Sequence, residues 1–122
     1  MKISAIELEK LLDEIPVALT YVDKNGIILY RNRTAAQRPS PKGTREPGAN
    51  IRDCHASPKS LELIEKIFND FKNGRKTPHH YISQRTDIKE LVTLTPIFEK
   101  DQFVGCFSTI HPLEIKGESR TF

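Results

Sequence analysis

Hydrophobic positions change spacing several times along the chain, and each change marks a predicted element. In residues 3–15, isoleucines and leucines recur every three or four positions with charged residues between them, which predicts an amphipathic helix. Ser4 and Glu7 form the S-x-x-E pattern of a helix-capping box. Pro16 ends this helix, because the residue before a proline avoids helical backbone angles.

A β-hairpin is predicted next. Residues 17–22 and 27–31 are rich in β-branched and aromatic side chains, as strands usually are. Between them, Asn25 and Gly26 supply the positive φ angles of a tight turn. Asn32 is then the predicted N-cap of a short helix that extends to residue 37.

The middle of the chain predicts a long loop followed by the main helix. Prolines and glycines interrupt residues 38–49, which indicates an irregular loop. Ser57 and Pro58 are typical of a helix start, and Gly74 is typical of its end. One broad apolar stripe between them predicts a wall of the core, formed by Leu61, Leu63, Ile64, Ile67, Phe68 and Phe71.

Three strands are predicted to close the chain, over residues 79–85, 90–99 and 103–111. Pro96 indicates an edge position or a bulge, because proline cannot donate a hydrogen bond to a neighbouring strand. Gly105 indicates a bulge or the close approach of another group.

Composition limits the class of protein. A chain of 122 residues, 37% of them hydrophobic and 29% charged, is typical of one soluble globular domain. It contains no apolar run near the roughly 20 residues of a membrane span, and its start lacks the apolar core of a secretory signal. Two cysteines are too few for a disulfide scaffold, so we expect a reducing, cytoplasmic location.

The net charge of +3 does not by itself indicate nucleic-acid binding. Basic residues nevertheless gather in residues 31–49, where Glu46 is the one acidic residue. Two interpretations stay open for this segment, a solvated loop or a site for an anion or partner. Its basic residues are Arg31, Arg33, Arg38, Lys42 and Arg45, so its charge is five minus one, or +4.

The order of these elements resembles the PAS domain over almost the whole chain. Residues 11–32 look like the PAS opening, in which a helix leads to a strand, an Asp-x-x-Gly turn and a second strand ending in Asn. The resemblance implies an α+β fold over residues 1–113, followed by a flexible tail over 114–122. It implies a five-stranded antiparallel sheet in the order 2-1-5-4-3, with helices on one face enclosing a small-molecule pocket.

A shorter segment resembles one PAS subgroup. That subgroup carries a Cys-His-Pro-Pro-Lys-Ser segment and is often joined to hemerythrin-like domains. An Ala-Ser pair replaces the first proline here, so the start of the long helix departs from the subgroup pattern. The matching residues are Cys54, His55, Pro58, Lys59 and Ser60.

The implied pocket directs attention to the entrance of the long helix. His55 either ligates haem iron or hydrogen-bonds an acidic ligand, or it simply packs the loop against the helix. Cys54 is either a reactive thiolate or a small buried hydrophobe, and the second interpretation is favoured. A zinc site with His79 and His80 is disfavoured, because the paired ligand spacing is missing. The predicted ligand-binding residues are His55, Cys54, Arg52, Ser60, Tyr21 and Phe107.

No catalytic motif is recognisable, so we expect a protein that is not an enzyme. The expected function is a stand-alone sensory domain that binds a small molecule or haem and signals through a protein partner or homodimer, without nucleic acid or membrane. The PAS resemblance places dimer contacts on the N-terminal helix, where Leu8, Leu11 and Leu12 are candidates. The alternative is an interaction module without a ligand.

Overall fold

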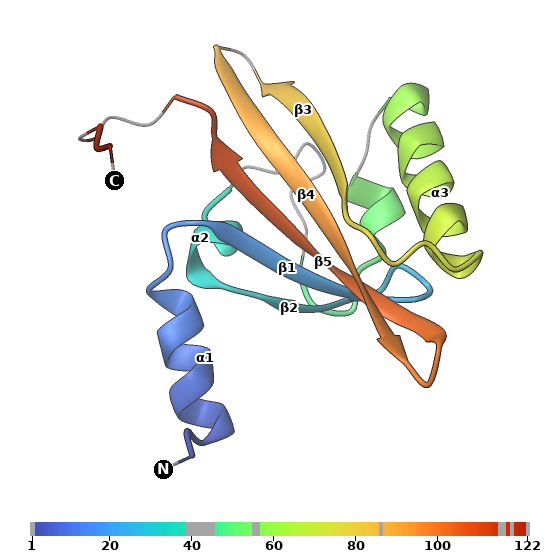
Figure 1. The fold of residues 1–122 in the computed structure, drawn as a ribbon, viewed down its shortest axis with the longest axis horizontal. Helices are drawn as coiled ribbons and strands as arrows, with labels where there is room; N and C mark the ends of the chain where they lie inside the picture. Colours follow the sequence, from blue (N-terminus) through green and yellow to red (C-terminus); the bar gives the residue numbers. More distant parts are fainter. Residues whose placement is uncertain are drawn as a thin grey trace.

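The fold is built on one antiparallel sheet whose strand order is β2-β1-β5-β4-β3 (Figure 1). This order confirms the prediction from the PAS resemblance. The strands are β1 (Ala18–Asp23), β2 (Ile28–Arg31), β3 (His79–Arg85), β4 (Ile88–Glu99) and β5 (Gln102–Pro112). The helices are α1 (Ala5–Asp13), α2 (Arg33–Ala36), the 3-10 helix η1 (Ile51–Cys54) and α3 (Pro58–Lys72).

The structure is a computed structural model. It describes residues 2–38, 46–54, 57–85, 87–114, 117 and 119–121, without the side chain of Arg85. Most of the predicted loop over 38–49 therefore lies outside the described residues.

Helix α1 is capped by Ser4 as its sequence predicts, and it is shorter than the predicted residues 3–15. The backbone N–H of Glu7 donates to Ser4 Oγ at 3.1 Å, and the Ser4 hydroxyl donates to the Glu7 carboxylate at 2.9 Å. The helix ends at Asp13, ahead of Pro16. Helix α1 projects from the sheet (Figure 1), and none of its side chains is buried.

The turn between β1 and β2 differs from the predicted two-residue type. Gly26 has a positive φ of 85°, whereas Asn25 does not. The Asp23 carboxylate closes the turn instead, by accepting from the backbone N–H groups of Asn25 at 2.9 Å and Ile27 at 3.0 Å. Two consecutive positive φ angles occur between β4 and β5, at Lys100 (49°) and Asp101 (62°), where the sequence carries no glycine.

Helix α3 is the main wall of the core, as predicted. Four residues of its apolar stripe are fully buried against the sheet, and Leu61 and Leu63 are half-buried. The Phe68 ring meets the Phe103 ring of β5 edge-on at 5.9 Å between centroids. The four buried residues are Ile64, Ile67, Phe68 and Phe71.

Asn32 caps α2 as predicted, and it also joins three elements. Its Oδ1 accepts from the backbone N–H groups of Ala35 and Leu19, both at 3.0 Å. Its Nδ2 donates to the carbonyl oxygens of Leu12 at 3.0 Å and Val17 at 2.9 Å. Asn32 is completely buried, so this one side chain ties the end of α1 to β1 and α2.

Gly105 and Pro96 lie where their backbone chemistry requires. A Cβ on Gly105 would lie 2.4 Å from the Val22 carbonyl oxygen and 2.5 Å from the Tyr21 hydroxyl, which confirms a close approach. Pro96 pairs with Cys106 of β5, and β3 begins only opposite Leu94. Pro96 therefore has a strand on one side, next to a register shift between residues 97 and 98.

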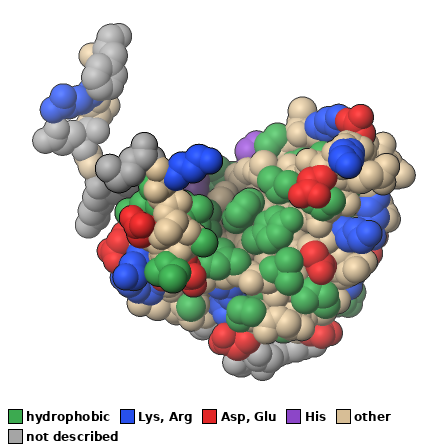
Figure 2. Space-filling model, turned by 90° about the horizontal axis from the view of Figure 1, so that it is seen from below, with side chains coloured by type: hydrophobic (Ala, Val, Ile, Leu, Met, Phe, Trp, Pro, Cys, Tyr) green, Lys and Arg blue, Asp and Glu red, His purple; other side chains and the backbone are tan. Residues whose placement is uncertain are grey.

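The exposed surface includes a hydrophobic area. Figure 2 shows hydrophobic side chains gathered on the face seen from below in Figure 1, the side toward which α1 projects. No helix in the described part of the chain is long and apolar enough to cross a membrane. The exposed large side chains at the N-terminal end are Ile3, Ile6, Leu8, Leu11 and Ile15.

Candidate functional site

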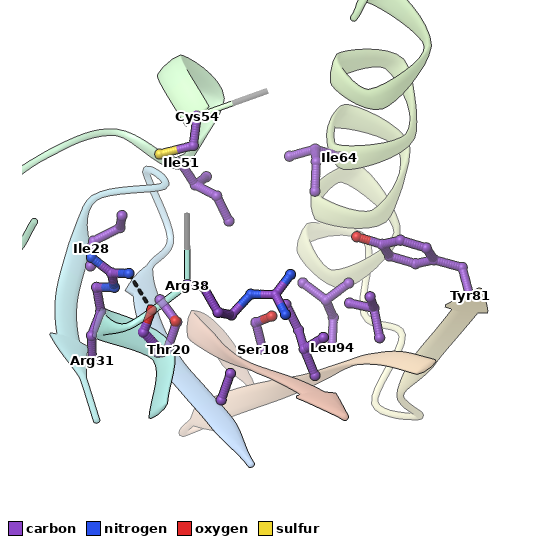
Figure 3. A pocket seen from close by; sticks show the side chains of 14 residues that line it. Thr20, Ile28, Arg31, Arg38, Ile51, Cys54, Ile64, Tyr81, Leu94 and Ser108 are labelled. Atoms are coloured by element: carbon purple, nitrogen blue, oxygen red, sulfur yellow. Dashed lines mark hydrogen bonds between the residues drawn. The ribbon is translucent and has the colours of Figure 1, made fainter. Parts of the chain in front are cut away.

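A cavity lies between the sheet and the helices that cover it (Figure 3). It leaves about 70 Å³ for the centres of water-sized molecules. One water needs roughly 10–15 Å³ of such space, so a ligand of a few non-hydrogen atoms fits. Its wall is mostly apolar, and the polar side chains that line it are Thr20, Arg31, Arg38, Cys54, Tyr81 and Ser108.

Strand alternation decides which side chains reach the cavity. Successive residues of a strand point to opposite faces of the sheet. Thr20 of β1 and Ser108 of β5 line the cavity and pair directly in the register of these strands. Their neighbours Tyr21 and Phe107 also pair with each other, so they belong to the opposite face.

Arg38 is held at the cavity by a buried ion pair. Its Nη1 lies 2.6 Å from Glu90 Oε2 and its Nη2 lies 3.1 Å from Glu90 Oε1, which is a two-pronged contact. The two side chains are only 17% and 6% exposed. Among the described residues, the buried Arg38 Nε has no hydrogen-bond partner.

Arg31 brings a second guanidinium to the same cavity. Its side chain is 7% exposed, and its Nη2 donates to the carbonyl oxygen of Ala35. Its Nη1 lies 3.9 Å from the carboxylate of Glu46, which is 76% exposed and therefore well screened. The described lining thus contributes two positive side chains and no carboxylate.

Of the predicted ligand-binding residues, Cys54 lines the cavity. It is buried, and its Sγ lies 3.8 Å from the Asn50 carbonyl oxygen. His55, the predicted haem ligand, lies outside the described residues. Cys54 and Cys106 are not joined by a disulfide bond.

Arg52 and Ser60 have structural contacts and are absent from the cavity lining. Arg52 forms an ion pair with Glu65 of α3, donates to the Asn25 carbonyl oxygen at 2.8 Å, and lies over the Phe68 ring at 5.5 Å. It thereby fastens η1 to α3 and to the hairpin turn. The N–H of Ser60 donates to Ser57 Oγ at 3.1 Å, which is an N-cap contact of α3.

Tyr21 and Phe107 pack against each other, with ring centroids 4.9 Å apart. The prediction placed both at the ligand, whereas neither lines the cavity. The physical reason is strand alternation, which gives the cavity face to the adjacent Thr20 and Ser108. Aromatic character marked these residues in the sequence, but it carries no information about which face a strand residue takes.

Cys106 lies in the core and away from the cavity lining. Burial raises the pKa of the Cys106 thiol to about 12. At neutral pH this thiol is therefore protonated and unreactive, because only the thiolate is a nucleophile. Cys106 is a small buried hydrophobe in the core cluster.

The proposed dimer residues lie on an exposed helix. Leu8 and Leu11 are exposed, whereas Leu12 is half-buried, and its carbonyl oxygen accepts a hydrogen bond from Asn32. Leu8 and Leu11 are thus available to a partner, and Leu12 belongs in part to the junction between α1 and the sheet.

Two cavity residues lay in the basic segment that the sequence left open between a solvated loop and an anion site. Arg31 and Arg38 line the cavity, whereas Arg33 contacts Glu14 at the surface. The local charge excess was the available signal in the sequence. The Glu90 partner of Arg38 is 52 positions away, which no local pattern reveals.

Metal and haem sites find little support. His79 Nε2 lies 3.0 Å from Asp70 Oδ2, and His80 Nδ1 lies 2.9 Å from Thr93 Oγ1. Among the described residues, no group of three or more His, Cys, Asp or Glu side chains is arranged to hold a metal ion. Among the described residues the cavity lining contains no histidine, and the predicted haem ligand His55 lies outside them.

A five-stranded antiparallel sheet in this order, with helices enclosing a small cavity, is the architecture of the PAS fold. The family profile described as the PAS domain matches residues 8–109. The chain belongs to the PAS domain family. No curated protein sequence matches it.

Several solved structures are similar over most of the chain. A C-terminal domain from Streptococcus mutans is 23% identical with a TM-score of 0.72, and the match covers 92% of this chain and 87% of that one. A sensory box sensor histidine kinase from Vibrio cholerae is 17% identical with a TM-score of 0.62, covering 89% and 88%. The PAS domain of BvgS from Bordetella pertussis is 13% identical with a TM-score of 0.66, covering 89% and 85%. At these identities the likeness concerns the fold.

Proposed function

We propose that this PAS domain is a sensory module that binds a compact small molecule in the cavity between the sheet and α3. The observation that supports the proposal is the cavity itself, with an apolar wall and a few converging polar groups. That combination is typical of small-molecule sites in proteins. Because no histidine lines the cavity among the described residues, the proposal takes a colourless ligand in preference to haem.

The elements around the cavity give binding a route to the surface. Side chains of α2, η1 and α3 line it together with the sheet. A ligand that touches all of them favours one packing of these elements over others, and a partner protein reads that packing as a shift of populations. Within the family, we place the chain with the subgroup that carries the Cys-His-Pro-Pro-Lys-Ser segment, on the matching Cys54, Lys59 and Ser60.

Filling the cavity tests the proposal. Ser108→Leu adds a side chain inside the cavity, whereas Thr109→Leu adds the same bulk to the opposite face of β5. A ligand at a hundred times its Kd stabilises a protein by about 2.7 kcal/mol, which corresponds to several degrees in Tm. We expect at least one compound of a metabolite panel to raise the Tm of the native chain and of Thr109→Leu, but not of Ser108→Leu.

Two outcomes of these measurements would contradict the proposal in different ways. No shift with any compound, together with no small molecule released from the purified protein in its mass spectrum, would overturn the ligand proposal. A Soret band that is lost in His55→Ala would instead favour haem.

Dimerisation is a second candidate function, and α1 favours it. The helix has no buried side chain, and Ile6 and Leu11 are 69% and 53% exposed. An apolar stripe on a helix is usually buried against another element. We expect Leu11→Glu to lower the sedimentation coefficient to that of a monomer, while Lys10→Glu on the same helix leaves it unchanged. Monomeric behaviour of the native chain at high concentration would contradict this function.

A further inference from the structure

Arg38 connects the chain just after α2 to β4 across the cavity. Its terminal nitrogens Nη1 and Nη2 contact the Glu90 carboxylate at 2.6 and 3.1 Å. Because strand residues alternate between faces, Glu90 shares a face of β4 with Val92 and Leu94, which line the cavity. Figure 3 shows the Arg38 side chain extended across the middle of the cavity. The ion pair therefore fixes the position of this guanidinium at the cavity.

One hydrogen-bond donor of Arg38 is not used by this ion pair. A guanidinium donates through its two terminal nitrogens and through Nε. Glu90 engages the terminal nitrogens, whereas the buried Nε has no hydrogen-bond partner among the described residues. Buried donors in folded proteins nearly always have an acceptor. An oxygen atom of a bound molecule would satisfy Nε without disturbing the contact with Glu90.

The surroundings of Nε favour a neutral acceptor. An ammonium group has no acceptor to offer. A carboxylate on the same guanidinium would lie close to that of Glu90, and like charges that share a buried site disfavour each other. The other guanidinium at the cavity has contacts of its own, since Arg31 Nη2 donates to the Ala35 carbonyl oxygen and Nη1 lies 3.9 Å from the Glu46 carboxylate. A carbonyl oxygen, which accepts without a charge, therefore fits best.

The walls of the cavity limit the rest of the ligand. Thr20 and Ser108, which pair in the register of β1 and β5, bring two hydroxyl groups to the cavity. A hydroxyl group can also donate to a carbonyl oxygen, which has two lone pairs. Hydrocarbon from Ile28, Ile64 and Leu94 lines other parts of the cavity. The space of about 70 Å³ admits only a few non-hydrogen atoms, so the ligand has a short apolar chain.

We propose that the ligand of this PAS domain is a small neutral carbonyl compound, and that Arg38 determines this specificity. Arg38 Nε donates to the carbonyl oxygen, and the short apolar chain lies against Ile64 and Leu94. This inference rests on the proposed function, because it concerns the same cavity.

The first experiment compares small probes that differ in acceptor and charge. The native chain is titrated with butanone, with the alkene in which a CH₂ group replaces the carbonyl oxygen of butanone, with butyrate and with butylamine. Tm and calorimetric binding are measured. We expect butanone to raise the Tm and to bind at least about tenfold more tightly than the alkene, because a hydrogen bond to a charged donor is gained. Butyrate and butylamine should bind more weakly than butanone.

The Arg38→Lys variant separates Nε from the ion pair. Lysine keeps a positive charge for Glu90 but lacks the Nε–H group. We expect this variant to bind butanone and the alkene with similar affinity. Arg33→Lys is the matched control, because Arg33 pairs with Glu14 at the surface and is absent from the cavity lining. This control should keep the native preference for butanone.

Equal binding of butanone and the alkene to the native chain, or an unchanged preference in Arg38→Lys, would overturn the role of Nε. Tighter binding of butyrate than of butanone would overturn the neutral class. If Arg38→Lys does not fold, NMR of the Arg38 Nε–H group in the native chain decides, because its signal should move with butanone and not with the alkene. If another class of compound raises the Tm and butanone does not, this inference is wrong and the proposed function stands. If no compound raises the Tm and none is released from the purified protein, both are wrong.

Discussion

The Asn32→Ala variant is expected to lose about 3–5 kcal/mol of unfolding free energy, because each buried polar group left without its partner costs about 1–3 kcal/mol. The Asn32 amide is the partner of two backbone N–H groups and two backbone carbonyls, all within 3.0 Å. Alanine reaches none of them, and the site is completely buried. Urea denaturation followed by circular dichroism measures the loss.

Two further variants separate this role from a general effect of substitution. Asn69→Ala changes an exposed asparagine on α3 and should alter stability by less than about 0.5 kcal/mol. Asn32→Asp keeps the Oδ1 acceptor but places a second carboxylate oxygen against the carbonyls of Leu12 and Val17, so it should also destabilise at pH 7. One unsatisfied buried group costs at least about 1 kcal/mol. A smaller loss in Asn32→Ala would therefore contradict the conclusion that Asn32 joins α1, β1 and α2.

The Phe68→Ala variant is also expected to lose a large part of the unfolding free energy. The ring is completely buried, meets Phe103 edge-on at 5.9 Å, and lies beneath the Arg52 guanidinium. Truncating a buried phenylalanine to alanine costs about 3–5 kcal/mol, because burial is lost and a cavity remains. We expect this loss in urea denaturation.

Phe68→Leu fills most of the space and should lose much less, while Glu62→Ala, on the exposed side of the same helix, should stay within about 0.5 kcal/mol. If Phe68→Ala were no less stable than Glu62→Ala, α3 would not be the wall of the core that its burial indicates.

Local patterns were sufficient for the secondary structure and, through the family resemblance, for the sheet order. The stripe from Ile64 to Phe71, the Ser4 and Ser57 caps and the stop at Gly74 each depend on residues a few positions apart. The positive φ angles of the turn at Lys100 and Asp101 were not predicted, because no glycine marks this turn and lysine rarely adopts positive φ. There the pairing of β4 with β5 overrides local preference.

The candidate site was predicted less well, and for a physical reason. The sequence by itself determined the helices, the strands, an asparagine cap at Asn32 and a local excess of positive charge. Tertiary structure alone decided that Asn32 joins three elements and that Thr20 and Ser108 take the cavity face in place of Tyr21 and Phe107. It also paired Arg38 with Glu90 across 52 positions. Periodicity and capping act between neighbours in the chain, whereas a cavity and its buried charges arise from strand register and from contacts between distant segments.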